Sequence, residues 1–336
     1  MLTRSSPFLH IPVPWMPPAL YTWAHPNRTI WSKMPGIKVF HVTALATLFL
    51  SSVLMSIAAQ DTCTTSSQPN PIAQQYADTP TGTLNTTLAI VPIPLDTARR
   101  IVPAQHAILE DAYRALMPDF PEGMYPVLVT AGLDHDIQLA ALSINVQDFQ
   151  RFGWSFPFID LLGDGYSSFT MAPAQMISAD NQMAINGSLD YGTIVHPANF
   201  DPGCEAYGRL ASGSTYFKGQ AADDSGKYVM LEFSPLGEGE SNPFPVEVYQ
   251  NITNQPIFAN GTQCDRMVRL FNSTINQGQW APVPVKGTVF SNLEPMEDTT
   301  EGLGEVFGIL VDTPFIEFNA QDCTTLKGYS GTGPGD

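Results

Sequence analysis

Arg151-Phe152-Gly153-Trp154-Ser155-Phe156-Pro157-Phe158 is the stretch that says most about the fold of this 336-residue chain. Aromatic residues alternate in it with small, polar or charged ones, and alternate side chains of a β-strand point to the same face of the sheet. The pattern predicts a strand with all its rings on one face. That face is either buried in the core or forms the aromatic wall of a ligand cavity inside a barrel. The candidate ligand-binding residues are Phe152, Trp154, Phe156 and Phe158.

Short apolar runs that read as further strands flank this stretch on both sides. Glycine and proline separate them at short intervals, which is typical of an antiparallel sheet that closes into a barrel or packs as a sandwich. Two segments, 96–102 and 105–117, have the apolar spacing of helices. The expected class is therefore mainly β (α+β). The candidate strands are 84–91, 125–131, 138–146, 183–189, 228–233, 266–271 and 306–311.

An uncharged run of 21 residues, Val39 to Ala59, precedes the β-rich region. Lys33 and Lys38 stand before it and small residues end it, which is the pattern of a cleaved secretory signal peptide. An uncut signal-anchor is the alternative, because about 20 apolar residues span a bilayer. In both cases we expect the rest of the chain to lie outside the cytosol, as a secreted or a membrane-anchored extracellular or lumenal domain.

The part of the chain after this run is strongly acidic. The first 60 residues hold four basic and no acidic side chains, which leaves 11 basic and 32 acidic ones and a net charge near −21. Such a charge repels phosphate backbones and anionic membrane surfaces. Nucleic acid is therefore excluded as a partner, and a small molecule is the expected ligand.

Four cysteines follow the apolar run, and an oxidising compartment favours disulfides over free thiols. We expect Cys63–Cys323, which would tie the two ends of the domain together, and Cys204–Cys264; buried free thiols are the alternative. The chain has no CxxC pair, so neither a zinc site nor a redox motif is predicted.

Five N-glycosylation sequons also follow the run, and each sequon that carries a glycan must lie on the surface. Together they predict a glycoprotein. The acceptor residues are Asn85, Asn186, Asn251, Asn260 and Asn272.

Two groups of ionisable residues are candidates for acid–base chemistry. In Asp134-His135-Asp136 a histidine stands between two carboxylates, which would raise its pKa and let it donate a proton. In a strand the two aspartates would share one face and His135 would take the other. Asp164, which follows the aromatic stretch, is a second candidate general acid or base if it lies at the mouth of a cavity. The alternatives are a solvated charged turn for the first group and an Asp-Gly turn for Asp164.

Several motifs of known chemistry are missing from the sequence. It has no GxSxG elbow, no HExxH pair, no P-loop and no EF-hand loop. No metal or cofactor is therefore predicted.

Two stretches resemble acetoacetate decarboxylase. The first, Ile93 to Pro103, is similar to that family's early segment, in which an aspartate opens a short helix that ends in Val-Pro. The second, Gly187-Ser188-Leu189-Asp190-Tyr191-Gly192, is similar to the family's Gly-Thr-Leu-Asp-Tyr-Gly strand and turn. Between them, Gly163-Asp164-Gly165 falls where the family carries Gly-Arg-Glu. The resemblance covers about residues 84–200 and implies a closed antiparallel β-barrel around a small-molecule cavity.

The catalytic lysines of that family are not matched. The family forms a Schiff base between a lysine and a β-keto acid, with a second lysine depressing the pKa of the first. Its lysine positions fall near Thr170, Met171 and Ala172, and this chain has no lysine between Lys38 and Lys218. We therefore predict that no imine intermediate forms.

These observations give the expected organisation and three functional hypotheses. The chain should comprise a signal or anchor segment (1–60), a flexible lead-in (61–82), an acetoacetate decarboxylase-like barrel (83–327) and a flexible tail (328–336). The first hypothesis is a secreted enzyme of the lyase or decarboxylase kind, performing acid–base chemistry on a small oxo acid or polyketide-like compound, as in secondary metabolism. The second is a non-catalytic binding protein for an apolar small molecule. The third is a surface glycoprotein with no ligand.

Overall fold

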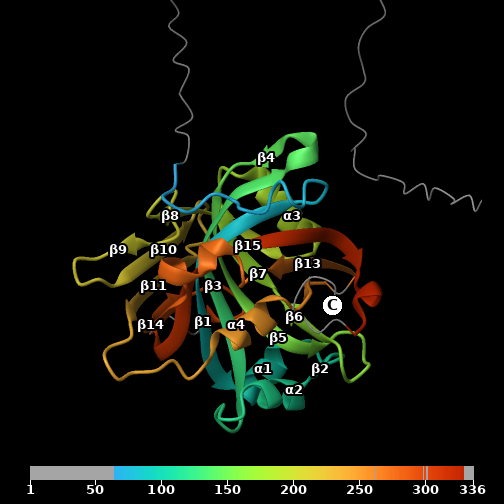
Figure 1. Ribbon diagram of the computed structural model, residues 1–336. Helices are drawn as coiled ribbons and strands as arrows, with labels where there is room; N and C mark the ends of the chain where they lie inside the picture. The colour runs from blue at the N-terminus through green and yellow to red at the C-terminus, as the bar shows by residue number, and fades with distance from the viewer. Residues whose placement is uncertain (1–63, 261, 298, 300–301, 329–336) are drawn as a thin grey trace, which may run out of the picture. The chain divides into compact units, whose positions relative to one another are not determined.

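A computed structural model describes residues 64–260, 262–297, 299 and 302–328 of the chain (Figure 1). The apolar run 39–59 and the tail from residue 329 lie outside the described residues. Within the described part, every helix is too short or too polar to cross a bilayer.

The dominant feature of the fold is a 15-stranded sheet. Its longest strands are rich in β-branched and aromatic residues, which favour extended backbone. The strands are β1 (Thr81–Pro94), β2 (Ala107–Ile108), β3 (Met124–Leu139), β4 (Ile144–Val146), β5 (Phe149–Asp160), β6 (Ser168–Met171), β7 (Ala174–Ser178), β8 (Ile194–Asp201), β9 (Gly208–Arg209), β10 (Thr215–Ala221), β11 (Tyr228–Pro235), β12 (Ile257–Phe258), β13 (Gln263–Arg269), β14 (Val283–Ser291) and β15 (Leu303–Asp322).

The strand pairings run in a ring. From β5 the order is β7, β8, β10, β11, β14, β15, β1 and β3, and β3 pairs with β5 again. A second path leads from β5 through β6, β12 and β13 to β15. The sheet is mixed, because β7 pairs with β8 and β12 with β6 in parallel. The expectation of a purely antiparallel sheet was therefore wrong at these two places.

Helices are few and short. In α1 and α2 acidic residues occupy the first turn and arginines the last, which suits the helix dipole. These two helices lie together at one end of the sheet, away from α3 (Figure 1). The α-helices are α1 (Leu95–Ile101), α2 (Glu110–Leu116), α3 (Gln182–Asp190) and α4 (Val246–Thr253), and 3-10 turns cover Ala140–Leu142, Thr274–Asn276, Gly278–Trp280 and Cys323–Leu326.

Three of the predicted secondary-structure elements were wrong in whole or in part. Of the expected helix over 105–117 only α2 is helical, since residues 107–108 pair with β5 as the short strand β2. Residues 183–189 form α3 instead of a strand, because Asn181 caps a helix there: its side chain accepts a hydrogen bond from Ala184 N at 2.9 Å. The helix ends at Asp190 with Tyr191 as its C-cap, and Gly192 follows with a φ of +83° that favours glycine. Residues 138–146 do not form one strand either, since a 3-10 turn and a left-handed Ser143 interrupt it.

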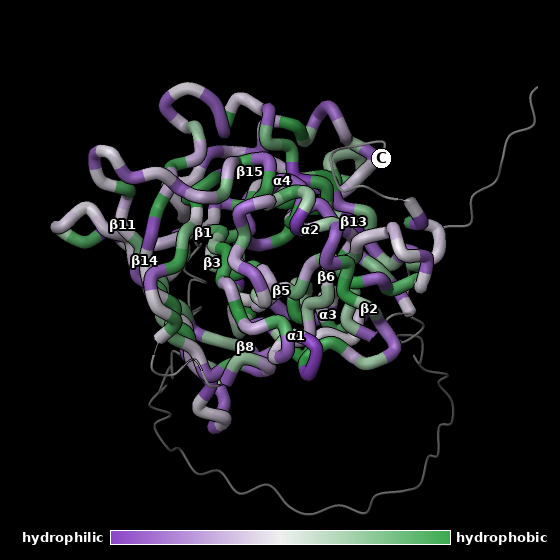
Figure 2. The backbone as a smooth tube through the Cα atoms, turned by 90° about the horizontal axis from the view of Figure 1, so that it is seen from below, coloured by the Kyte–Doolittle hydropathy of each residue, from purple (hydrophilic) through white to green (hydrophobic). Residues whose placement is uncertain are grey.

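The aromatic stretch lies in the main hydrophobic core. All four of its rings are buried, and Phe152 packs edge-on against Trp154 with ring centroids 5.4 Å apart. The regular alternation ends after Phe156, because the register shifts there and Phe158 adopts a φ of +61°. Figure 2 shows hydrophobic stretches along the strands, while many peripheral loops are hydrophilic.

Residues 64–80, part of the lead-in that we expected to be flexible, are held to the sheet. Ser66 N donates to Glu205 at 2.8 Å and Asn70 N to Asp136 at 2.7 Å. These bonds join the lead-in to the β3 end of the sheet and to the loop after β8.

The predicted disulfide pairing was wrong. Cys264 is bonded to Cys323, with Cα atoms 5.1 Å apart. Antiparallel pairing of β13 with β15 sets Cys264 opposite Gln321, so the chain just after β15 brings Cys323 beside it. Cys204 is also disulfide-bonded, and Cys63 lies outside the described residues.

Candidate functional site

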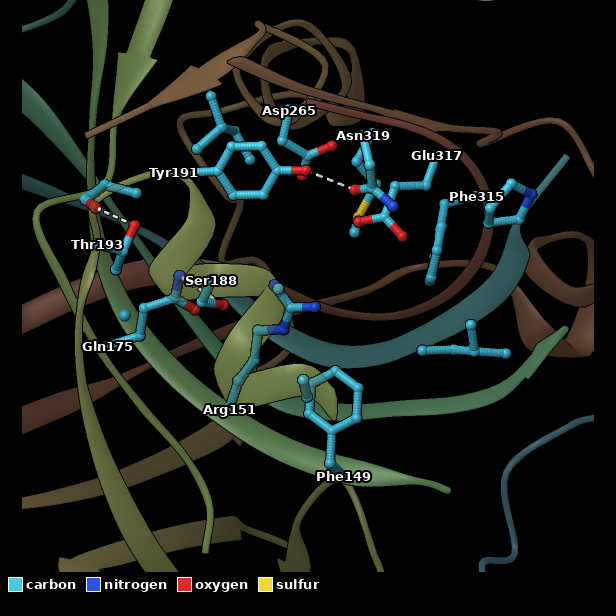
Figure 3. A pocket seen from close by; sticks show the side chains of 18 of the residues that line it. Phe149, Arg151, Gln175, Ser188, Tyr191, Thr193, Asp265, Phe315, Glu317 and Asn319 are labelled. Carbon is cyan, nitrogen blue, oxygen red and sulfur yellow. Dashed lines mark hydrogen bonds between the residues drawn. The ribbon is translucent and has the colours of Figure 1, made fainter. Parts of the chain in front are cut away.

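A cavity of about 330 Å³ lies beside β5 (Figure 3). From β5 it is lined by Phe149, Arg151, Gly153 and Ser155, the residues that alternate with the aromatic stripe. Of the stripe itself only Trp154 borders the cavity; Phe152, Phe156 and Phe158 do not. The aromatic face of β5 thus packs in the core, and the opposite face of β5 lines the cavity.

Strands β13 and β15 supply the opposite wall by the same alternation. Asp265, Met267 and Arg269 from β13 line the cavity, as do Phe315, Glu317 and Asn319 from β15. The two strands are paired with Met267 opposite Glu317. A bulge between Cys264 and Arg266 shifts this register near Asp265, and bulges commonly re-aim side chains at functional sites.

Charged side chains meet at the buried end of the cavity. Arg151 binds Asp134 in a bidentate ion pair, with Nε–Oδ2 and Nη2–Oδ1 distances of 2.5 and 2.8 Å. Asp134 is fully buried on β3, and the guanidinium of Arg151 points into the cavity (Figure 3). Arg269 donates through Nη1 to the carbonyl of Thr253, and burial lowers its pKa to about 10. Together with Asp265 and Glu317 the group holds two cations and three carboxyls.

Asp265 and Glu317 form a pair of carboxyls that titrate abnormally. Burial is the main cause that raises the pKa of Asp265 well above its usual range, and the neighbouring Glu317 raises it further. Burial likewise raises the pKa of Glu317, with Asp134 adding to the effect and Arg151 opposing it. Because two arginines face three carboxyls, one proton on the pair makes the group neutral. One carboxyl of the pair can therefore carry a proton, while the other is ionised and can accept one.

Two polar atoms at this end lack a hydrogen-bond partner in the described part of the chain. They are Asp265 Oδ1 and Arg269 Nε, both buried. Buried polar atoms are nearly always paired, so both atoms carry the energetic cost of an unmade hydrogen bond.

Helix α3 closes one side of the cavity. Its residues Met183, Gly187 and Ser188 line the space, as does Tyr191 at its C-terminal end. The Tyr191 hydroxyl donates to Asn319 Oδ1 at 2.6 Å and accepts from Ala320 N at 3.2 Å (Figure 3). The segment that resembles the Leu-Asp-Tyr motif of acetoacetate decarboxylase therefore anchors α3 to β15 at the bulge.

The predicted Asp134-His135-Asp136 group is divided between two environments. Asp134 faces Arg151, as above, whereas His135 points to the other side, as expected for a strand. There its Nδ1 lies 2.9 Å from Thr83 Oγ1 and its Nε2 lies 3.2 Å from Asp312. Asp136 accepts from Asn70 N and Gln138 Nε2. The structure thus brings only Asp134 next to the cavity, through its ion pair.

Asp164 lies in the turn after β5. It accepts hydrogen bonds from Tyr166 N, Ser167 N and Ser167 Oγ. The bonds from Ser167 lower the pKa of Asp164, which is the opposite of what a general acid near neutral pH needs. This geometry corresponds to the Asp-Gly turn alternative, and Asp164 does not line the cavity.

The five predicted glycosylation sites differ in exposure. Asn186, Asn260 and Asn272 are exposed, and Asn251 on α4 is half-buried. Asn85 lies inside β1, half-buried, with its Nδ2 donating to Ser67 at 2.8 Å. Glycosylation of the chain stays a prediction.

The sequence interpretation missed Asp265, Arg269 and Glu317. A usable pattern was present: Asp265, Met267 and Arg269 alternate, as do Phe315, Glu317 and Asn319. Charged residues at alternate positions of an apolar strand are the feature that would have identified them.

No protein-family model matches the chain, and no curated protein matches it either. Solved structures do match. One is the enduracididine biosynthesis enzyme MppR complexed with pyruvate, at 10% identity and a TM-score of 0.41, covering 71% of this chain and 87% of that one. Another is an acetoacetate decarboxylase-like enzyme from Sphingomonas wittichii RW1, at 9% identity and a TM-score of 0.39, covering 73% and 93%.

The raised carboxyl pKa values predict how stability depends on pH. The folded protein keeps a proton that free Asp and Glu side chains lose above about pH 4. The free energy of unfolding should therefore fall as pH rises above that value, by up to about 1.4 kcal/mol per pH unit for each retained proton. Urea denaturation from pH 4.5 to 7.5 measures this slope.

Asp265→Asn is the variant that isolates this effect. Half-buried Asp148 also has a raised pKa and acts in the same direction. Glu294, with a pKa of about 2, acts in the opposite direction near pH 4.5, where its side chain in the unfolded chain is still partly protonated. The variant should show a shallower slope than the wild type. Equal slopes would mean that Asp265 is ionised in the folded protein.

Proposed function

We propose that this protein is an enzyme that moves a proton on a small oxo acid held in the cavity, without a Schiff base. The observation that carries the proposal is the Asp265–Glu317 pair, whose pKa values are raised at the buried end of a cavity that also presents two guanidinium groups. Carboxyl groups with shifted pKa values in a cavity commonly act as general acids or bases.

Each side chain has a role in this proposal. The guanidinium of Arg269, which lines the cavity, pairs with the substrate carboxylate. Glu317 removes a proton from the carbon next to the oxo group, and Asp265 gives its proton to the oxo oxygen, so that an enol forms. For a β-keto acid, loss of CO2 takes the place of proton removal and Asp265 again protonates the oxygen. Arg151, held by Asp134, balances the charge of Glu317.

The lysines support a route without an imine. Lys218, Lys227 and Lys286 form ion pairs with carboxylates elsewhere on the protein. None of the residues that line the cavity is a lysine. A Schiff-base nucleophile needs an unprotonated amine, and neighbouring carboxylates favour the charged form.

The test is proton exchange in D2O followed by NMR. Pyruvate should lose its methyl proton signal, and acetoacetate should lose either its C2 protons or its carboxyl group, faster with the protein than in buffer. Borohydride treatment in the presence of acetoacetate should leave the intact mass unchanged. Binding of both acids without exchange or CO2 release would instead indicate a non-catalytic binding protein, and a borohydride adduct on Lys218 would overturn the imine-free route.

A further inference from the structure

The cavity has a charged end and an apolar end. Asp265 and Arg269 are only 5% and 6% exposed and Glu317 is half-buried, so the charged end is the deeper one. Ile144 on β4 and Met183 on α3 also line the cavity, yet they are 42% and 59% exposed. These two side chains, together with the exposed Asn319, therefore mark the mouth. Leu142, two residues before Ile144, is 65% exposed as well.

An apolar wall connects the two ends. Ile137, Phe149, Met267 and Phe315 line the cavity and are all buried, and they belong to a hydrophobic cluster separate from the main core. Single exposed apolar residues are ordinary on protein surfaces. Here, however, exposed apolar residues from two separate elements continue a buried apolar wall at one opening, which is the arrangement of a site for an apolar chain.

The size of the cavity sets the length of that chain. At about 30 Å³ per heavy atom, the volume that water takes in the liquid, 330 Å³ holds about eleven heavy atoms. The head group of a 2-oxo acid, a carboxylate and its oxo carbon and oxygen, accounts for five of them. About six carbons remain, which gives an acid of about eight carbons in total.

We propose that the substrate is an oxo acid with an unbranched apolar chain of about eight carbons. This rests on the proposed function for the identity of the head group. The acid group lies at Arg269, the chain runs along Phe149, Met267 and Phe315, and its end lies between Ile144 and Met183. The exposed apolar mouth thus determines chain-length specificity, while the charged end is common to all acids of the class.

Binding to the full-length protein tests the proposal. Calorimetry is done with straight-chain 2-oxo acids of three to ten carbons, and with the matching carboxylic acids that lack the oxo group. Each added CH2 contributes about 0.8 kcal/mol when buried, so Kd should fall about fourfold per carbon up to about eight carbons and then level off. A Kd that does not change with chain length would overturn the inference.

Two kinds of variant locate the chain. Ile144→Ser combined with Met183→Ser should remove the gain between six and eight carbons, and should weaken binding of the eight-carbon acid much more than binding of pyruvate. Gly187→Leu should shift the preference to shorter acids, because a Cβ at this cavity-lining glycine meets no atom within 4 Å and the side chain can fill the mouth. Gly304→Leu, equally free of contacts but on β15 away from the cavity, is the matched control.

The outcomes for the two proposals are separate. The Kd of acids that lack the oxo group could depend on chain length while no oxo acid exchanges a proton. In that case the apolar site for the chain is supported and the enzymatic proposal fails. If pyruvate exchanges its protons but Gly187→Leu and Gly304→Leu have the same Kd values for every acid of the series, the enzymatic proposal is supported and the apolar site for the chain is not.

Discussion

Asp265→Asn should slow proton exchange of the oxo acid by about 10²- to 10⁴-fold, the usual contribution of a general acid or base. Asparagine keeps the shape of the side chain but carries no proton that it can give up. Glu317→Gln should have an effect of similar size. The double variant should be little slower than either single one, since the two carboxyls share one proton and act as a unit. The measurement is the NMR exchange rate at saturating pyruvate.

The control for both substitutions is Glu232→Gln, which removes an exposed carboxylate from β11, outside the cavity. Asp164→Asn serves as a second comparison, because that residue was our candidate from sequence. Asp265→Asn and Glu317→Gln could both exchange protons at the wild-type rate while Asp164→Asn loses most of that rate. This result would indicate that proton transfer takes place at the turn after β5.

Much of the fold could be predicted from local patterns, and the failures have definite causes. The alternation at 151–158 predicted β5, and the spacing in 96–102 predicted α1 almost to its bounds. The alternation at 134–136 also predicted that Asp134 and His135 face opposite ways, as they do. In 183–189 the apolar residues suit either a helix or a strand, and the capping by Asn181 decides between them.

The candidate site could not be assembled from sequence because its parts come from distant strands. Asp265 and Glu317 are two of 32 acidic residues, and only the pairing of β13 with β15 brings them together. The same pairing sets Cys264 beside Cys323, so the disulfide was equally dependent on strand register. Cysteine positions alone leave the connectivity open.

The ion pair beneath the cavity should be a strong determinant of stability. Asp134→Asn should lower the free energy of unfolding by about 3–5 kcal/mol at pH 4.5, because it leaves the guanidinium of Arg151 partly buried without its bidentate partner. At pH 7.5 the loss should be smaller. Loss of the Asp134 charge removes one cause of the raised pKa values of Asp265 and Glu317, so the second carboxyl of the pair ionises more readily and restores the charge balance.

Urea denaturation of the wild type and the variant at both pH values measures this difference. Asp96→Asn, which removes the exposed partner of Arg99 on α1, is the matched control and should change stability by less than about 1 kcal/mol. Replacing the whole pair, Asp134→Leu with Arg151→Met, should cost less than Asp134→Asn alone, because no unpaired charge remains. A loss below about 1 kcal/mol for Asp134→Asn at both pH values would show that Asp134 is not needed to balance Arg151, and that the arginine is held by the cavity carboxyls alone.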